Sequence, residues 1–140
     1  KMSKSDNSDY SRINLKDNKD LIDKKIKKAK TDSASIPSSV DELKNREEAK
    51  NLISIYASLN SMDVEKVLKE FSGKNFSTFK NKLSESIIER ICPIGKEIKK
   101  LLEDQRYLND ILVKGAKRAN IIAISNLKEI YEIMGLKKFT

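Results

Sequence analysis

The chain has 140 residues, a formal net charge of +8, 38% hydrophobic and 36% charged residues, one cysteine and no histidine. The lack of histidine excludes histidine-based acid–base catalysis and histidine metal ligands, and the single Cys92 excludes an internal disulfide and disfavours zinc. No apolar run approaches the roughly 20 residues that span a bilayer, and no secretory signal is present, so we expect a cytoplasmic globular protein without metal or membrane contacts.

Positive charge is concentrated near the start of the chain. Residues 1–30 hold ten Lys or Arg and five Asp, a net charge of +5, whereas the other 110 residues supply +3. A basic excess favours polyanions such as RNA or nucleotide phosphates. Because many basic proteins bind no nucleic acid, the charge alone leaves both interpretations open.

The first 40 residues predict a loop, a helix and a linker. Residues 1–17 are polar and lack a period, which is typical of a loop, and Asn18 is a plausible N-cap for a first helix. That helix combines an apolar stripe (Leu21, Ile22, Ile26 and Ala29) with a basic face (Lys24, Lys25, Lys27, Lys28 and Lys30). The basic face predicts either contact with RNA phosphates or a solvated surface. Residues 31–40 contain Pro37 and several hydroxyl side chains, and predict a linker.

Two helices are expected next. One runs from Asp41 or Arg46 to Leu59, and a short one begins near Val64 and stops at Gly73. The inward positions of both are Ala49, Leu52, Ile53, Tyr56, Ala57, Val64, Val67, Leu68 and Phe71.

Two longer helical patterns complete the chain. The first covers residues 76–101, where Pro93 should kink or break the helix, and the second covers residues 107–134. In the second, Gly115 indicates a break or a close helix crossing, and Gly135 a stop. Their apolar positions are Phe76, Phe79, Leu83, Ile87, Ile91, Ile94, Ile98 and Leu101, then Ile111, Leu112, Ala116, Ala119, Ala123, Leu127, Ile130 and Met134. Striped helices without strand alternation predict an all-α helical bundle around one shared core.

Several apolar or reactive side chains are assigned to the core. Five aromatic residues fall on the apolar stripes, so core packing is preferred for them over base stacking. They are Tyr56, Phe71, Phe76, Phe79 and Tyr107. Cys92 lies among isoleucines without a neighbouring base, and we expect it to be a buried, inert thiol.

The first five residues carry the chemistry. Lys1, Met2, Ser3, Lys4 and Ser5 form a string that resembles the KMSKS signature of class I aminoacyl-tRNA synthetases. When ATP activates an amino acid, negative charge grows on the departing pyrophosphate, and two ammonium groups on a closing loop can stabilise it. Lys1 and Lys4 suit that catalytic role, the two serines can add hydrogen bonds, and Met2 would anchor the loop.

Later segments extend the resemblance to bacterial tryptophanyl-tRNA synthetases. Order and spacing agree over essentially the whole chain. The matching segments are residues 6–7, 25–33 (KIKKAKTDS), 51–56 (NLISIY), 71–80 (FSGKNFSTFK), 115–119 (GAKRA) and 134–136 (MGL). The resemblance implies that residues 1–17 are the KMSKS loop and tail of a catalytic domain. It implies that residues 18–140, with the linker at 31–40, are the α-helical anticodon-binding domain.

The same resemblance implies a C-terminal fragment. The family's Rossmann half, with its histidine-containing HIGH signature, precedes the KMSKS loop and is absent here. We therefore expect the parent enzyme to be a homodimeric tryptophan–tRNA ligase that uses ATP with Mg²⁺, tryptophan and tRNA(Trp). The 140-residue chain alone is expected to be a monomer that holds no ATP and forms no tryptophanyl-adenylate.

Lys114, Lys117 and Arg118 are the candidates for contact with the anticodon loop, where Arg can both stack on bases and bond to their edges. Ordinary surface charge is the competing interpretation for each. Two other functions remain open: a stand-alone basic helical module that binds RNA, in which the KMSKS string is a coincidence, and a helical protein-interaction domain.

Overall fold

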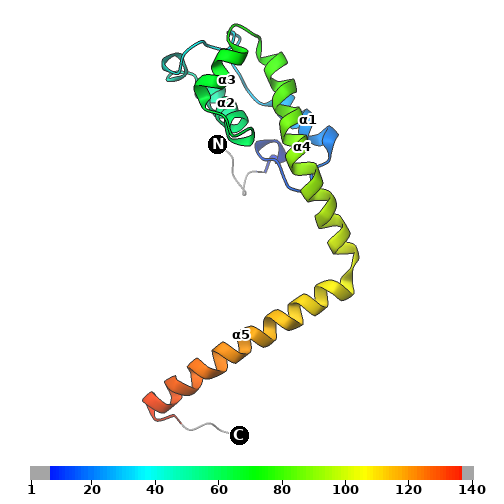
Figure 1. The fold of residues 1–140 in the computed structure, drawn as a ribbon, viewed down its shortest axis with the longest axis vertical. Helices are drawn as coiled ribbons and strands as arrows, with labels where there is room; N and C mark the ends of the chain where they lie inside the picture. The colour runs from blue at the N-terminus through cyan, green and yellow to red at the C-terminus, as the bar shows by residue number, and fades with distance from the viewer. Residues whose placement is uncertain (1–6, 137–140) are drawn as a thin grey trace. The chain divides into compact units, whose positions relative to one another are not determined.

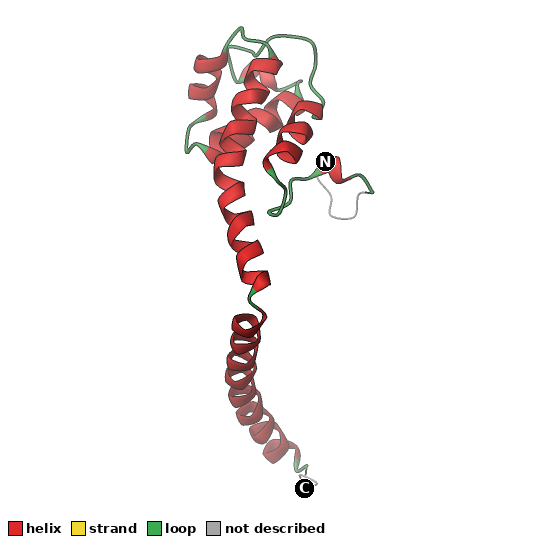
Figure 2. Cartoon of the chain, turned by 90° about the vertical axis from the view of Figure 1, so that its right-hand side faces the viewer, coloured by secondary structure: helices red, strands yellow, loops and turns green. Residues whose placement is uncertain are grey.

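The described part of the chain, residues 7–136 of a computed structural model, is helical and contains no strand (Figures 1 and 2). The elements are η1 (Asp9–Ser11), α1 (Lys19–Lys28), η2 (Asp41–Leu43), α2 (Glu47–Leu59), α3 (Val64–Phe71), α4 (Phe76–Glu103) and α5 (Gln105–Met134). The all-α prediction is therefore confirmed. None of the helices in this range combines the length and apolar character needed to cross a bilayer.

The chain forms two compact units, divided between Ile98 and Lys99. The first contains the apolar core, in which three aromatic rings pack against one another. The ring centroid of Phe71 lies 5.3 Å from that of Tyr56 and 5.1 Å from that of Phe79, in edge-to-face arrangements. Such pairs add to the free energy gained from burial. Buried residues of α1, α2, α3 and the first half of α4 surround this cluster.

Sequence-predicted helix ends are confirmed at three places. The Asn18 side chain accepts a hydrogen bond of 2.9 Å from the backbone N–H of Leu21, so it caps α1 as expected. Gly73 and Gly135 follow α3 and α5 with φ of +75° and +66°, a left-handed conformation that glycine adopts without strain.

Pro93 was expected to kink or break the helix, and it does not break α4: the helix continues from Phe76 to Glu103. Proline removes one hydrogen bond by leaving the carbonyl of Glu89 without its intrahelical donor. Both Glu89 and Pro93 are exposed, so water can satisfy that carbonyl. The helix does not break at Pro93 because the lost bond lies on its solvent side.

Gly115 neither interrupts α5 nor marks a close crossing. The helix runs through it, and a Cβ built at this position would meet nothing within 4 Å. An interior glycine destabilises a helix by about 1 kcal/mol relative to alanine, which a helix of 30 residues can absorb.

The buried apolar core of the described residues lies in the first unit. The core ends at Ile87, and α5 has no buried residue. Tyr107 is 49% exposed rather than buried, and Cys92 is only half-buried. The predicted stripe of α5 is equally exposed, as in Leu112 at 69%. The second unit consists of the end of α4 and α5, so within that unit the stripe has no second layer to pack against.

Candidate functional site

The KMSKS string, Lys1 to Ser5, lies outside the described residues. The structure begins just beyond it, with a connecting segment that we define as residues 7–17. In Figure 1 this blue segment precedes α1. Its contacts decide how the helical part of the chain holds the residues that follow the signature.

Lys25 of α1 clasps both ends of the connecting segment. Its Nζ lies 2.6 Å from Asp17 Oδ2 and 2.7 Å from Asp9 Oδ2. The side chains of Lys25 and Asp17 are only 2% and 7% exposed, whereas that of Asp9 is 48% exposed. The sequence had placed Lys25 on a basic face open to RNA or solvent. It is instead a buried ion-pair partner, because it is the lysine of this face whose ammonium group is enclosed between α1 and the carboxylates of the segment.

The environment of the ion pairs shifts the pKa of Lys25 and that of Asp9. Burial works to lower the pKa of Lys25, but its hydrogen bonds to Asp17 and Asp9 and the charges of these carboxylates outweigh burial and raise this pKa above its ordinary value. The hydrogen bond from Lys25, with another from Asn14, lowers the pKa of Asp9. Lys25 and Asp9 each favour the charged form of the other, so both stay ionised at neutral pH.

Further bonds fold the connecting segment around the same carboxylates. The backbone N–H of Asn14 donates to Asp17 Oδ2 at 2.9 Å, and the Asn14 amide donates to Asp9 Oδ1 at 3.0 Å. Arg12 Nε lies 3.2 Å from Asp9 Oδ1. Both carboxylates therefore accept hydrogen bonds from the connecting segment and from Lys25.

Helix α4 bounds the other side of the segment. The carbonyl oxygen of Leu15 lies 2.6 Å from the position that a Cβ of Gly95 would occupy. Any larger residue at Gly95 would push into the backbone of the segment. The close approach explains a glycine in the middle of a 28-residue helix.

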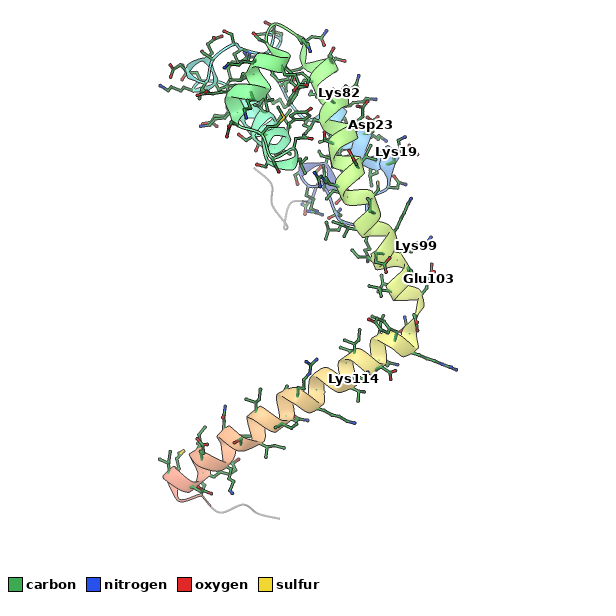
Figure 3. The ribbon with its side chains drawn as sticks, viewed as in Figure 1. Lys19, Asp23, Lys82, Lys99, Glu103 and Lys114 are labelled. Carbon is green, nitrogen blue, oxygen red and sulfur yellow. The ribbon has the colours of Figure 1, made fainter. Side chains whose placement is uncertain are left out.

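Helix α1 is itself bonded to α4. The Ser84 hydroxyl donates to Asp23 at 3.0 Å, and Lys80 Nζ donates to the carbonyl of Ala29, the C-cap of α1, at 2.6 Å. Burial lowers the pKa of Lys80. Figure 3 shows Lys19 and Asp23 on α1 alongside α4. Lys25 is thus mounted on a helix that the rest of the first unit holds in place.

The remaining lysines of the α1 region are partly neutralised. Lys27 lies 2.7 Å from Asp23, and Lys30 lies 3.1 Å from Glu48. The ammonium group of Lys28 lies 4.4 Å from the ring centroid of Tyr10. Less positive charge is therefore available to a phosphate than the sequence suggested, although these side chains remain exposed.

The second candidate surface lies on α5. Lys114, Lys117 and Arg118 are three and four positions apart, so they share one helix face, and all three are exposed. Figure 3 shows Lys114 projecting from the helix. No acidic residue occurs between Asp110 and Glu129. The stretch between them combines basic side chains with exposed isoleucines and carries no carboxylate of its own.

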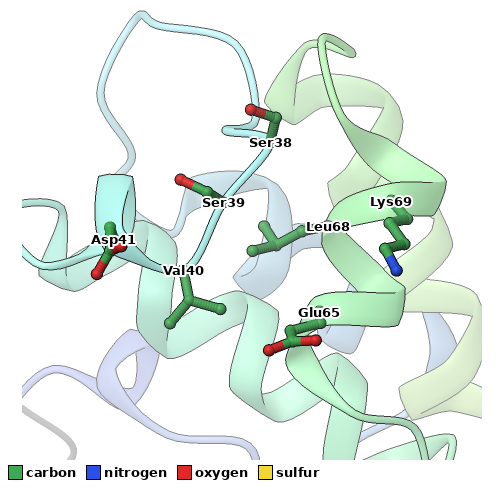
Figure 4. A pocket seen from close by; sticks show the side chains of 7 residues that line it. All are labelled: Ser38, Ser39, Val40, Asp41, Glu65, Leu68 and Lys69. Atoms are coloured by element: carbon green, nitrogen blue, oxygen red, sulfur yellow. The ribbon is translucent and has the colours of Figure 1, made fainter.

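A shallow pocket in the first unit does not suit a nucleotide (Figure 4). Its lining residues are Ser38, Ser39, Val40, Asp41, Glu65, Leu68 and Lys69. Ser38 and Ser39 already donate to Glu42, at 3.0 and 2.9 Å. Two lining carboxylates against one ammonium group would repel phosphate.

Comparison with known proteins decides the family. The family described as tRNA synthetases class I (W and Y) matches residues 1–91, more than half of the chain. The chain belongs to this family. Its signature, Lys1 to Ser5, and the connecting segment both fall within the matched range.

Curated relatives and a solved structure extend the match to the C-terminal helix. The chain is 47% identical to a tryptophan–tRNA ligase of Mesorhizobium japonicum, over 97% of this chain and 38% of that protein. It is 49% identical to one of Agrobacterium fabrum, over 96% and 38%. The crystal structure of tryptophanyl-tRNA synthetase from Mycoplasma pneumoniae superposes with a TM-score of 0.74 at 25% identity, covering 97% of this chain and 41% of that one. The chain thus spans about two-fifths of these relatives and corresponds to their C-terminal part.

Sequence reasoning missed the clasp, the ion pairs of Lys25 with Asp9 and Asp17, and it missed the close approach at Gly95. Asp9 lies 16 residues before Lys25, a separation at which no local pattern predicts contact. Gly95 offered a signal, because an isolated glycine within a helical pattern often marks a close backbone approach.

Proposed function

We propose that the chain is the C-terminal part of a tryptophan–tRNA ligase. It would supply the KMSKS loop and tail in residues 1–17 and the helical anticodon-binding domain in residues 18–140. The observation that carries the proposal is 45–49% identity to tryptophan–tRNA ligases along 96–97% of this chain, with the KMSKS string at its start.

In this enzyme Lys1 and Lys4 are the catalytic residues of the chain. Their ammonium groups would approach the β- and γ-phosphates of ATP while the tryptophan carboxylate attacks the α-phosphorus. Charge that accumulates on the leaving pyrophosphate would be stabilised more in the transition state than in the ground state. Met2, Ser3 and Ser5 complete the ATP-binding loop.

ATP is the proposed nucleotide substrate, and Mg²⁺ would accompany its phosphates. Residues 7–136 contain no group of three or more histidine, cysteine, aspartate or glutamate side chains that could hold a metal ion. Lys1 and Lys4 are proposed as the chain's own source of positive charge for these phosphates.

Transfer to tRNA(Trp) is proposed to use α5. Lys114, Lys117 and Arg118 lie on its acid-free stretch, where phosphate contacts would add salt-dependent affinity and Arg118 could stack on an unpaired anticodon base. The ligase is proposed to be a cytoplasmic homodimer. The 140-residue chain alone is proposed to be a monomer that cannot form the adenylate.

A titration of the chain with tRNA(Trp), beside a copy whose CCA anticodon is scrambled, tests the assignment. Both titrations are run at low and at moderate salt, with a fluorophore on the tRNA. Preference for the native anticodon that persists at the higher salt supports an anticodon-binding domain. Equal affinities that collapse with salt identify a basic helical RNA-binding module, because backbone contacts carry no sequence information.

A further inference from the structure

We infer that Lys25 is a positioning residue for the reaction with ATP, which it serves by clasping Asp9 and Asp17 and thereby seating the connecting segment behind the KMSKS signature. This inference rests on the proposed function. Lys25 acts through the segment, and it is not proposed to touch ATP.

The first argument is the burial of the ion pair. A lysine side chain that is 2% exposed and a carboxylate that is 7% exposed are stable only when each faces the other. The pair is therefore satisfied in one arrangement of the segment. A shift of the segment away from α1 would leave charge buried without a partner.

The second argument is that two helices, α1 and α4, contact the connecting segment. Lys25 holds the segment from α1, and Gly95 lets the Leu15 carbonyl approach α4 more closely than any residue with a Cβ would allow. Hydrogen bonds from Ser84 to Asp23 and from Lys80 to the carbonyl of Ala29 hold α4 and α1 together. Movement of the segment is thus limited from both sides.

The third argument is chain length. Asp9 follows the last residue of the signature, Ser5, by four positions. A chain extends at most about 3.5 Å per residue, so the place of Asp9 limits where Lys1 and Lys4 can act. A misplacement of about 1 Å in a catalytic group can slow a reaction by about 100-fold.

The test uses the full-length ligase that contains this chain. Tryptophan-dependent pyrophosphate exchange is measured with ATP varied at saturating tryptophan, and with tryptophan varied at saturating ATP. The variant is Lys25→Met, which keeps the length of the side chain and removes its charge. Lys19→Met, an exposed lysine on the same helix, is the matched control.

We expect Lys25→Met to lower kcat/KM for ATP by about 10- to 100-fold, while KM for tryptophan stays within about twofold. A residue with a merely structural role would not separate the two substrates. Gly95→Ala displaces the same segment without altering charge, so it should show the same ATP-selective loss. Gly115→Ala, on a helix face with nothing within 4 Å, should leave exchange unchanged.

Wild-type ATP kinetics in folded Lys25→Met and Gly95→Ala would overturn the inference, as would a KM for tryptophan that rises by the same factor as kcat/KM for ATP falls. If circular dichroism shows that Lys25→Met does not fold, Asp9→Asn replaces it, because that carboxyl is half exposed. Asp9→Asn should show a smaller loss of the same kind, and unchanged ATP kinetics in it would also overturn the inference. A wild-type enzyme without tryptophan-dependent exchange would instead refute the proposed function.

Discussion

The carbonyl oxygen of Leu15 stands 2.6 Å from the place of a Cβ on Gly95, so at this point the backbone of the loop that enters α1 meets the backbone of α4. A carbonyl cannot rotate out of the way as the end of a long side chain can. A methyl group added at Gly95 would clash with this carbonyl. The clash, and not helix propensity, therefore decides how the substitution changes stability.

Gly95→Ala is expected to destabilise the chain, because overpacking against backbone costs about 1–3 kcal/mol and offsets the gain in helix propensity. Gly115→Ala meets no neighbour and should stabilise α5 by about 0.5–1 kcal/mol. Urea unfolding followed by far-UV circular dichroism measures the first change, and thermal melting of the helical signal the second. Equal effects of the two substitutions would show that the approach of Leu15 is not close.

Phe79→Ala should reduce the free energy of unfolding by about 3–5 kcal/mol, since the ring is fully buried between Tyr56 and Phe71 and its removal leaves a cavity. Leu112→Ala, at a side chain 69% exposed, is the control and should change it by less than about 0.5 kcal/mol. A comparable loss in both variants would mean that α5 is buried in solution.

Acid should weaken the bond between Arg46 and Asp32. Arg46 reaches both carboxylate oxygens, with Nε 2.8 Å from Oδ2 and Nη2 2.5 Å from Oδ1, and its hydrogen bonds lower the pKa of Asp32 from 3.8. A carboxyl with a lowered pKa stabilises the fold above its unfolded pKa, and this contribution is lost as pH falls through the folded pKa.

Unfolding by urea at pH 7 and at about pH 3 tests this dependence. The difference between the two pH values should be smaller in Asp32→Asn than in the wild type. At neutral pH the substitution should cost only about 0.5 kcal/mol, because the carboxylate is 40% exposed and solvent screens the pair. Asp41→Asn, in a pair with Lys44 that is exposed on both sides, is the control. An identical pH difference in Asp32→Asn and wild type would contradict the assignment.

Replacing Lys114, Lys117 and Arg118 together with Gln should weaken binding to tRNA(Trp). The slope of log affinity against log salt should fall in magnitude by about 2, since each lost phosphate contact removes about 0.7–0.9. A triple variant of exposed lysines in the first unit, at Lys44, Lys66 and Lys82, gives the control for net charge. If both triple variants lose the same slope, the charge of the whole chain and not the α5 surface governs binding.

The sequence was sufficient for the elements whose signals are local. The cap at Asn18, the stops at Gly73 and Gly135 and the aromatic positions around Phe79 depend on neighbours within a few residues, and all were predicted. At Pro93 the sequence left a kink or a break open, because the outcome depends on which side of α4 faces water.

The parts that failed involve distant partners. Periodicity showed that α5 has an apolar stripe, but it could not show whether anything covers that stripe. Ile36, in the predicted linker, is 1% exposed and exchanges backbone hydrogen bonds with Gly73 and Lys74, a pairing across more than 30 positions that composition does not reveal. The burial of Lys25 was missed for the same reason. The sequence does not distinguish the five lysines around α1, and only the fold shows that Lys25 is enclosed beside Asp17.

The clasp also restricts how this protein can change over evolutionary time. Loss of Lys25 alone leaves the enclosed Asp17 carboxyl without its lysine, and loss of Asp17 alone leaves the ammonium group with the exposed Asp9 as its remaining carboxylate. Viable replacements therefore have to alter Lys25 and Asp17 in the same lineage. Across descendants of this chain, the two positions should be inherited as one unit while Asp9 drifts more freely.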